Sequence, residues 1–105
     1  MDTQPLLLTS SAIVVSEKAS GYLQQLCKHF GHKVAVSFTP ERGTIVFDFG
    51  NCALAASGNM LSLTATAGTM VGLSRVQHVI ASHLERFAFR EKPEIVWNSG
   101  YPQSP

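Results

Sequence analysis

The residues best suited to hold a ligand lie in one short stretch, residues 22–33, where Cys27, His29 and His32 fall close together. Thiolate and imidazole are the ligands that zinc and the late first-row metals prefer, so these three residues, with His83, form a candidate metal site. On a continuous helix Cys27 and His29 diverge by about 200°, and they cannot chelate one ion together. A shared site therefore requires the helix to end near Gly31 and His83 to approach from elsewhere.

The same four side chains also fit a structural role. Cys27 flanks an apolar stripe and can serve as a small buried hydrophobe. His29 and His32 can complement the negative end of a helix dipole. His83 falls near the buried side of a second helix, where it is either a core histidine bonded to a carbonyl or carboxylate, or a ligand-binding group in a pocket. The sequence alone does not decide between a metal site and a structural role.

Arg86 and Arg90 are candidates for anion binding, because a guanidinium can hold a carboxylate or phosphate in bidentate fashion. The alternative is ordinary surface salt bridging, worth about 0–1 kcal/mol per pair. The chain has no G-x-S-x-G motif, no C-x-x-C motif and no plausibly spaced pair of catalytic carboxylates. We therefore predict no catalytic residue and no particular cofactor, and whether the chain is an enzyme stays open.

Composition favours one folded domain, residues 1–98, with a flexible C-terminal tail at residues 99–105. Of the 105 residues, 45% are apolar and only 14% are charged, which argues against disorder. The net charge is only +1 and the basic residues are scattered along the chain, so no nucleic-acid partner is expected. No apolar run approaches the length of a membrane span, and the N-terminus lacks the charge pattern of a signal peptide, so we expect a cytoplasmic protein with reduced cysteines.

Hydrophobic periodicity predicts two helices and six strands in the order β-α-β-β-β-β-α-β. The first helix should run over residues 17–30, with Ser16 as N-cap and Gly31 as a left-handed C-terminal residue. The second should begin near residues 68–70 and end before Pro93. The predicted strands cover residues 11–15, 34–38, 45–49, 52–56, 61–65 and 94–97, with tight turns at Gly50-Asn51 and at residues 57–59.

These elements predict an α+β fold, a two-layer sandwich with both helices on one face of an antiparallel sheet. The inward residues of the sheet should then pack against the apolar helix stripes. The sheet residues are Val36, Phe38, Ile45, Phe47, Leu54, Leu61 and Leu63; the helix residues are Leu23, Leu26, Phe30, Val76, Ile80 and Phe87.

The outward sheet residues predict a contact surface, because they are small and almost uncharged. They are Ala35, Ser37, Thr44, Val46, Asp48, Ala53, Ala55, Ser62 and Thr64. Small groups cost little to desolvate and let another backbone approach closely. The alternative is a solvated face that happens to be rich in Ser and Thr. We expect a homodimer, or a docked protein partner, on this face or an adjoining edge.

Two segments, residues 22–33 and 83–91, together resemble the bacterial family catalogued as domain of unknown function 2218. The likeness extends over about residues 14–97 and includes the stretch FDFGNC at residues 47–52. The family has no established activity, so the resemblance implies no catalytic residues. It does imply a context in iron and siderophore metabolism, because the domain is also fused to flavin-dependent siderophore-interacting reductases. The order β-α-β(4)-α is similar in shape to the TATA-binding-protein fold, an analogy that carries no function.

Residues and resemblance together predict a non-catalytic binding or accessory domain with a contextual link to iron or siderophore metabolism. The alternative is a small enzyme, or a metal or cofactor binder, that uses His29, His32 and His83.

Overall fold

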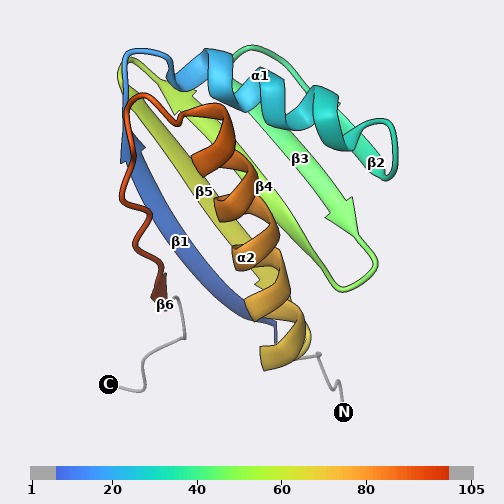
Figure 1. The fold of residues 1–105 in the computed structure, drawn as a ribbon. Helices are drawn as coiled ribbons and strands as arrows, with labels where there is room; N and C mark the ends of the chain where they lie inside the picture. The colour runs from blue at the N-terminus through green and yellow to red at the C-terminus, as the bar shows by residue number, and fades with distance from the viewer. Residues whose placement is uncertain (1–6, 100–105) are drawn as a thin grey trace.

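The computed structural model describes residues 7–99 and confirms the two-layer α+β sandwich (Figure 1). The element order is the predicted one, and the strands form an antiparallel sheet in the order β2-β3-β4-β5-β1-β6. The elements are β1 (Leu8–Val15), α1 (Ala19–Phe30), β2 (Ala35–Phe38), β3 (Arg42–Phe47), β4 (Gly50–Ser57), β5 (Met60–Ala67), α2 (Met70–Phe87) and β6 (Asn98–Ser99).

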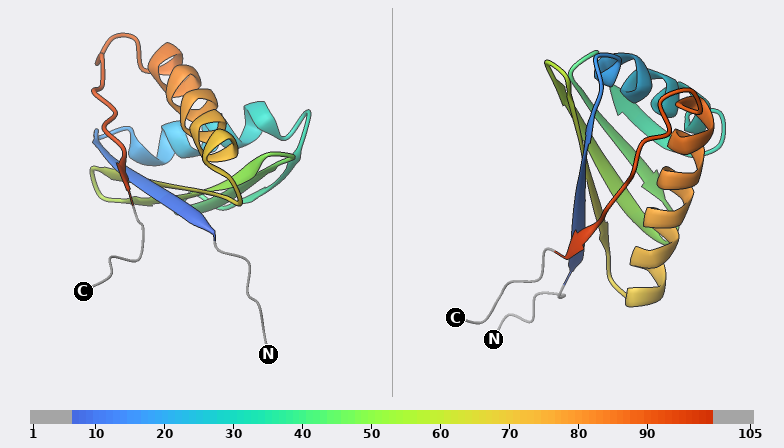
Figure 2. Two further views of the ribbon diagram at one scale, coloured as in Figure 1. Left: turned by 90° about the horizontal axis from the view of Figure 1, so that it is seen from below. Right: turned by 60° about the vertical axis from the view of Figure 1, so that its left-hand side comes forward.

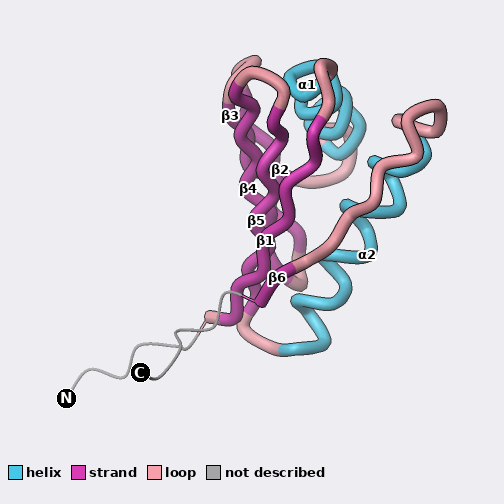
Figure 3. Tube along the Cα trace, turned by 90° about the vertical axis from the view of Figure 1, so that its left-hand side faces the viewer, coloured by secondary structure: helices cyan, strands magenta, loops and turns pink. Residues whose placement is uncertain are grey.

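Both helices lie on the same face of the sheet, and within residues 7–99 no helix covers the other face (Figures 2 and 3). Helix α1 packs over β2, β3 and β4, whereas α2 packs over β4, β5 and β1. The two helices lie at an angle to each other, and they touch where the C-terminal part of α2 reaches α1 (Figure 1). None of the helices in residues 7–99 is long and apolar enough to cross a lipid bilayer.

The core forms where the period-two stripes of the strands meet the period-3.6 stripes of the helices, as predicted. The most completely buried large side chains come from both layers, and they are Leu23, Leu26, Ile45, Leu61, Leu63, Val76, Ile80 and Leu84. Phe38 is the exception among the predicted inward residues, because 37% of its surface is exposed. It lies on β2, a four-residue edge strand with a neighbour on one side only, so the sheet cannot enclose it.

Helix α1 starts later and ends differently from the prediction. It begins at Ala19, and the hydroxyl of Ser16 accepts a hydrogen bond from the Lys18 N–H at 3.0 Å in the preceding turn. At its C-terminus Gly31 has φ −62°, which is not left-handed. The chain instead continues in right-handed turns, with the N–H groups of Lys33 and Val34 both bonded to the Phe30 carbonyl.

One of the two predicted hairpin turns is displaced. The β3–β4 reversal uses Asp48 and Phe49, and Gly50 is already paired with Phe47, so the predicted turn at Gly50-Asn51 was wrong. Glycine is needed there for close packing, because a Cβ on Gly50 would lie 2.6 Å from the Thr66 carbonyl oxygen. The β4–β5 turn is where it was predicted, with Gly58 at φ +58°.

Helix α2 begins near its predicted start. Thr69 is its N-cap, and the Thr69 hydroxyl accepts a hydrogen bond from the Gly72 N–H at 3.0 Å. The predicted last strand at residues 94–97 was wrong, because pairing to β1 is confined to Asn98 and Ser99. Ile95 and Trp97 instead pack against the core in irregular backbone. The predicted tail lies, except for its first residue, outside the described residues.

Candidate functional site

The crossing of α1 and α2 brings two of the four predicted metal ligands together. The ring centroids of His29, on α1, and His83, on α2, are 4.7 Å apart. The ring centroid of Phe30 lies 5.0 Å from that of His29 and 4.8 Å from that of His83. Phe87 flanks His29 at 5.8 Å. We call His29 and His83 the histidine pair.

The two rings of the histidine pair have different surroundings. His83 Nδ1 lies 2.7 Å from the Val79 carbonyl oxygen, and because a carbonyl can only accept, Nδ1 carries a proton. Burial, followed by the nearby His83, lowers the pKa of His29, which favours a neutral imidazole there at neutral pH. A neutral imidazole can act as a metal ligand or accept a proton.

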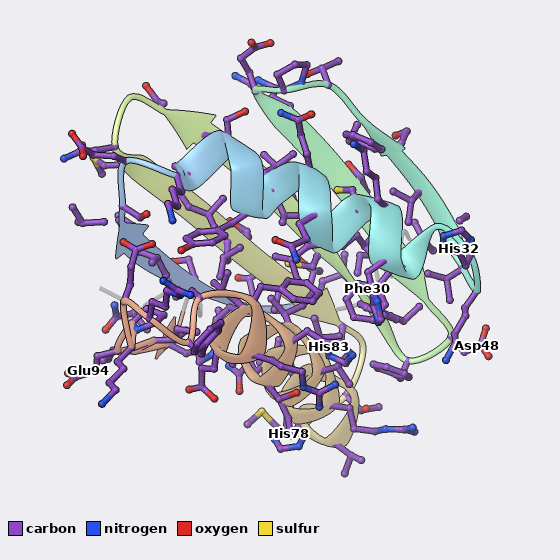
Figure 4. The ribbon with its side chains drawn as sticks, turned by 45° about the horizontal axis from the view of Figure 1, so that its top comes forward. Phe30, His32, Asp48, His78, His83 and Glu94 are labelled. Carbon is purple, nitrogen blue, oxygen red and sulfur yellow. The ribbon has the colours of Figure 1, made fainter. Side chains whose placement is uncertain are left out.

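The other predicted ligands do not join this pair. Cys27 is fully buried against β3, where a Cβ on Gly43 would lie 2.7 Å from its sulfur, and burial raises the pKa of the Cys27 thiol to about 11. His32 is exposed beyond the end of α1, apart from His83 (Figure 4). Within residues 7–99, no three His, Cys, Asp or Glu side chains converge as a metal site would require.

Arg86 and Arg90 have different surroundings in the structure. Arg86 is exposed and contributes to the positive charge around His29. The Arg90 guanidinium lies 5.5 Å above the ring of Phe89, near Lys18 at the start of α1. Arg90 lines a pocket beside Lys18, and Arg86 does not.

The structure adds a polar cluster that the sequence did not suggest. The hydroxyl of Tyr22 and the hydroxyl of Ser16 both donate to Glu91 Oε1, the second at 3.0 Å. These donors, Tyr22 first, hold the pKa of the Glu91 carboxyl below its usual value, while burial and then the carboxylate raise the pKa of Tyr22. The cluster links the segment after α2 to α1 and to the connection between β1 and α1. No local pattern could reveal it, since the partners are 69 and 75 positions apart.

The sheet face opposite the helices has no covering layer among residues 7–99, and the strand registers place small side chains there in continuous rows. One row runs across five strands through Ser11, Thr64, Ala53, Thr44 and Ser37. We call the whole set the outer face: Thr9, Ser11, Ile13, Val15, Ala35, Ser37, Arg42, Thr44, Val46, Asn51, Ala53, Ala55, Ser57, Met60, Ser62, Thr64 and Thr66.

Apolar side chains stand exposed among these small groups. Ile13 and Val15 expose 55% and 68% of their surface, and Val46 and Met60 expose 44% and 40%. Arg42 is the one charged member of the outer face, and Asp48 adds a carboxylate in the adjoining turn. A sheet face that is meant to stay in water normally carries more charge than this, so the composition favours contact with another surface.

Comparison with known proteins agrees with this architecture. The family described as "Uncharacterized protein conserved in bacteria (DUF2218)" matches residues 11–98. An NMR structure of the protein PA4090 from Pseudomonas aeruginosa is similar, with 40% sequence identity and a TM-score of 0.75. That similarity covers 87% of this chain and 95% of the Pseudomonas chain. No curated protein gave a significant match.

Proposed function

Because the chain belongs to DUF2218, a bacterial family without an assigned reaction, we propose that it acts as a non-catalytic binding domain whose outer face takes a second copy of the chain. The observation that carries the proposal is the uncovered sheet face, with exposed Ile13, Val15, Val46 and Met60 set among Ala, Ser and Thr. Burying those side chains removes apolar surface from water, which is the main driving force for association.

The size of the outer face supports a dimer. Five strands about 4.8 Å apart, each rising about 3.3 Å per residue, give a plan area of roughly 500–600 Å². The accessible surface of such a corrugated face is larger than its plan area. It approaches the area that a standard stable interface buries on each partner, which is about 800 Å². A two-fold axis through the sheet would pair like rows with one another, which is the commonest symmetry of homo-oligomers.

Ala53 lies near the middle of the outer face, between Thr44 and Thr64, and Ala53→Arg should convert the dimer to monomer. The reason is that a two-fold contact would bury two copies of the new charge opposite one another. Light scattering after size-exclusion chromatography, at micromolar concentration, measures the mass. The control is Ser74→Arg, which adds the same charge to an exposed position on α2 in the opposite layer. Equal masses for the two variants would count against the outer face.

A second role, binding of a metal or small cofactor, is favoured by the histidine pair. The Val79 carbonyl accepts a hydrogen bond from Nδ1–H of His83, and metal-ligating histidines usually make such a bond through the nitrogen that does not hold the metal. His32, from the predicted group, would need to be replaced by a ligand from solvent or a partner. The iron and siderophore context implied by the family resemblance, in a cytoplasmic protein, would suit this role.

Titration of the untagged protein with Fe(II), Co(II) and Zn(II) tests that role. His83→Ala should weaken metal binding about tenfold or more. Loss of a residue that merely hydrogen-bonds a metal ligand lowers metal affinity about 10–100-fold, and loss of the ligand itself should cost at least as much. His78→Ala is the matched control, since His78 is exposed on the outer side of the same helix (Figure 4). Absence of binding, or an equal loss in both variants, would contradict the role, and failure with Fe(II) alone would remove its link to iron.

A further inference from the structure

A pocket of about 400 Å³ lies between the first turns of α1 and the end of α2. We call it the interhelix pocket, and the residues that matter below are Lys18, Tyr22, Gln25, Phe87, Phe89 and Arg90. Its volume falls within the range of small-molecule sites. It lies on the helical layer, so it shares no residue with the outer face.

The apolar part of the interhelix pocket is aromatic. Tyr22 is buried and its hydroxyl is engaged by Glu91, so its ring is held in place. Phe87 is half-buried, whereas Phe89 exposes 63% of its surface. A flat ring laid against these side chains would gain offset or edge-to-face contacts and would cover apolar surface that now faces water.

The charged part of the interhelix pocket is positive. Among the described residues that line it, Lys18 and Arg90 are charged and no carboxylate is present. Arg90 is held over Phe89 by a cation–π contact, which helps to orient its planar donors. Glu91 lines a smaller, adjoining hollow that shares Tyr22 and Ala88 with the interhelix pocket. Its Oε1 already accepts from Tyr22 and Ser16, and Lys18 adds a weaker lowering of the pKa of the Glu91 carboxyl.

We infer that the interhelix pocket binds a small aromatic carboxylate. The ring lies against Tyr22 and the two phenylalanines, and the carboxylate meets Lys18 and Arg90, with the Gln25 amide as a further donor. A planar carboxylate matches the two-pronged donor geometry of a guanidinium. The inference rests on the pocket alone, and it holds or fails independently of dimer formation.

Chemical-shift titration of the ¹⁵N-labelled chain with benzoate tests the inference. Benzoate should shift the backbone amides of residues 18–25 and 87–90 in a saturable way. Benzamide, which keeps the ring and loses the charge, should bind more weakly, and benzamidinium should bind more weakly still. If benzoate moves no amide in these segments, or if all three compounds move them equally, the inference is wrong.

Substitution of the two cationic residues tests whether they bind the carboxylate. Lys18→Gln and Arg90→Gln should each weaken benzoate binding by about two- to fivefold, the usual size of a partly exposed ion pair, and the double variant should weaken it further. Arg86→Gln is the control, because Arg86 is exposed in the last turn of α2 and does not line the pocket. The amide spectrum of each variant reports directly whether it is folded. Equal losses for Arg86→Gln and Arg90→Gln would overturn the assignment of the site.

Discussion

Leu26→Ala is expected to lower the free energy of unfolding by about 2–5 kcal/mol, the largest effect of any single change considered for this chain. Leu26 is fully buried on the face of α1 that packs on β2, β3 and β4. Truncation removes buried methyl groups and leaves a cavity that a packed core fills only in part. Because small domains hold about 5–15 kcal/mol in total, the midpoint of urea denaturation should fall clearly.

The neighbouring residue provides the control for that measurement. Gln25 is exposed one position earlier on the same helix, so Gln25→Ala should change the stability by no more than about 0.5 kcal/mol. A loss below about 0.5 kcal/mol for Leu26→Ala would mean that α1 does not bury this face.

Gly72→Ala is expected to destabilise the protein by about 1–3 kcal/mol, against the rule for helices. Helix propensity alone predicts a gain of about 1 kcal/mol from the same change. The structure reverses the sign because a Cβ on Gly72 would lie 2.4 Å from the carbonyl oxygen of Phe49, a backbone atom that cannot turn away. The first turn of α2 therefore rests directly on the β3–β4 turn.

Gly21→Ala is the matched control for Gly72→Ala. Gly21 lies in α1, and a Cβ added there would meet nothing within 4 Å. The propensity rule should hold at this position, with a gain of about 0.5–1 kcal/mol. Thermal and urea unfolding of the two variants should move in opposite directions. Stabilisation by both would show that α2 does not rest on Phe49.

Much of the fold could be predicted because the chain repeats its apolar residues at two clear periods. The alternation along β3 and β5 separates inward from outward residues with few errors, and the stripe from Leu73 to Leu84 identifies the buried face of α2. The errors fall where tertiary contact outweighs a local rule. Phe38 obeys the alternation but lies on an edge strand, and Gly50 is held in the ladder by close packing against β5.

The candidate sites could be predicted only in part. Helical phase correctly placed His83 near the buried side, but only the crossing of α1 and α2 brings it to His29. The sequence predicted Ser16 as a helix cap, and that role gave no sign that Ser16 and Tyr22 both bond to Glu91. The pairing of Lys18 with Arg90 across one pocket likewise depends on where two distant helix ends meet.

Self-association through the outer face is the central claim, and sedimentation equilibrium of the unmodified chain at micromolar concentration tests it most directly. The expected result is a species of twice the 11.4 kDa chain mass that dissociates on dilution. A single 11.4 kDa species at every concentration would contradict the claim.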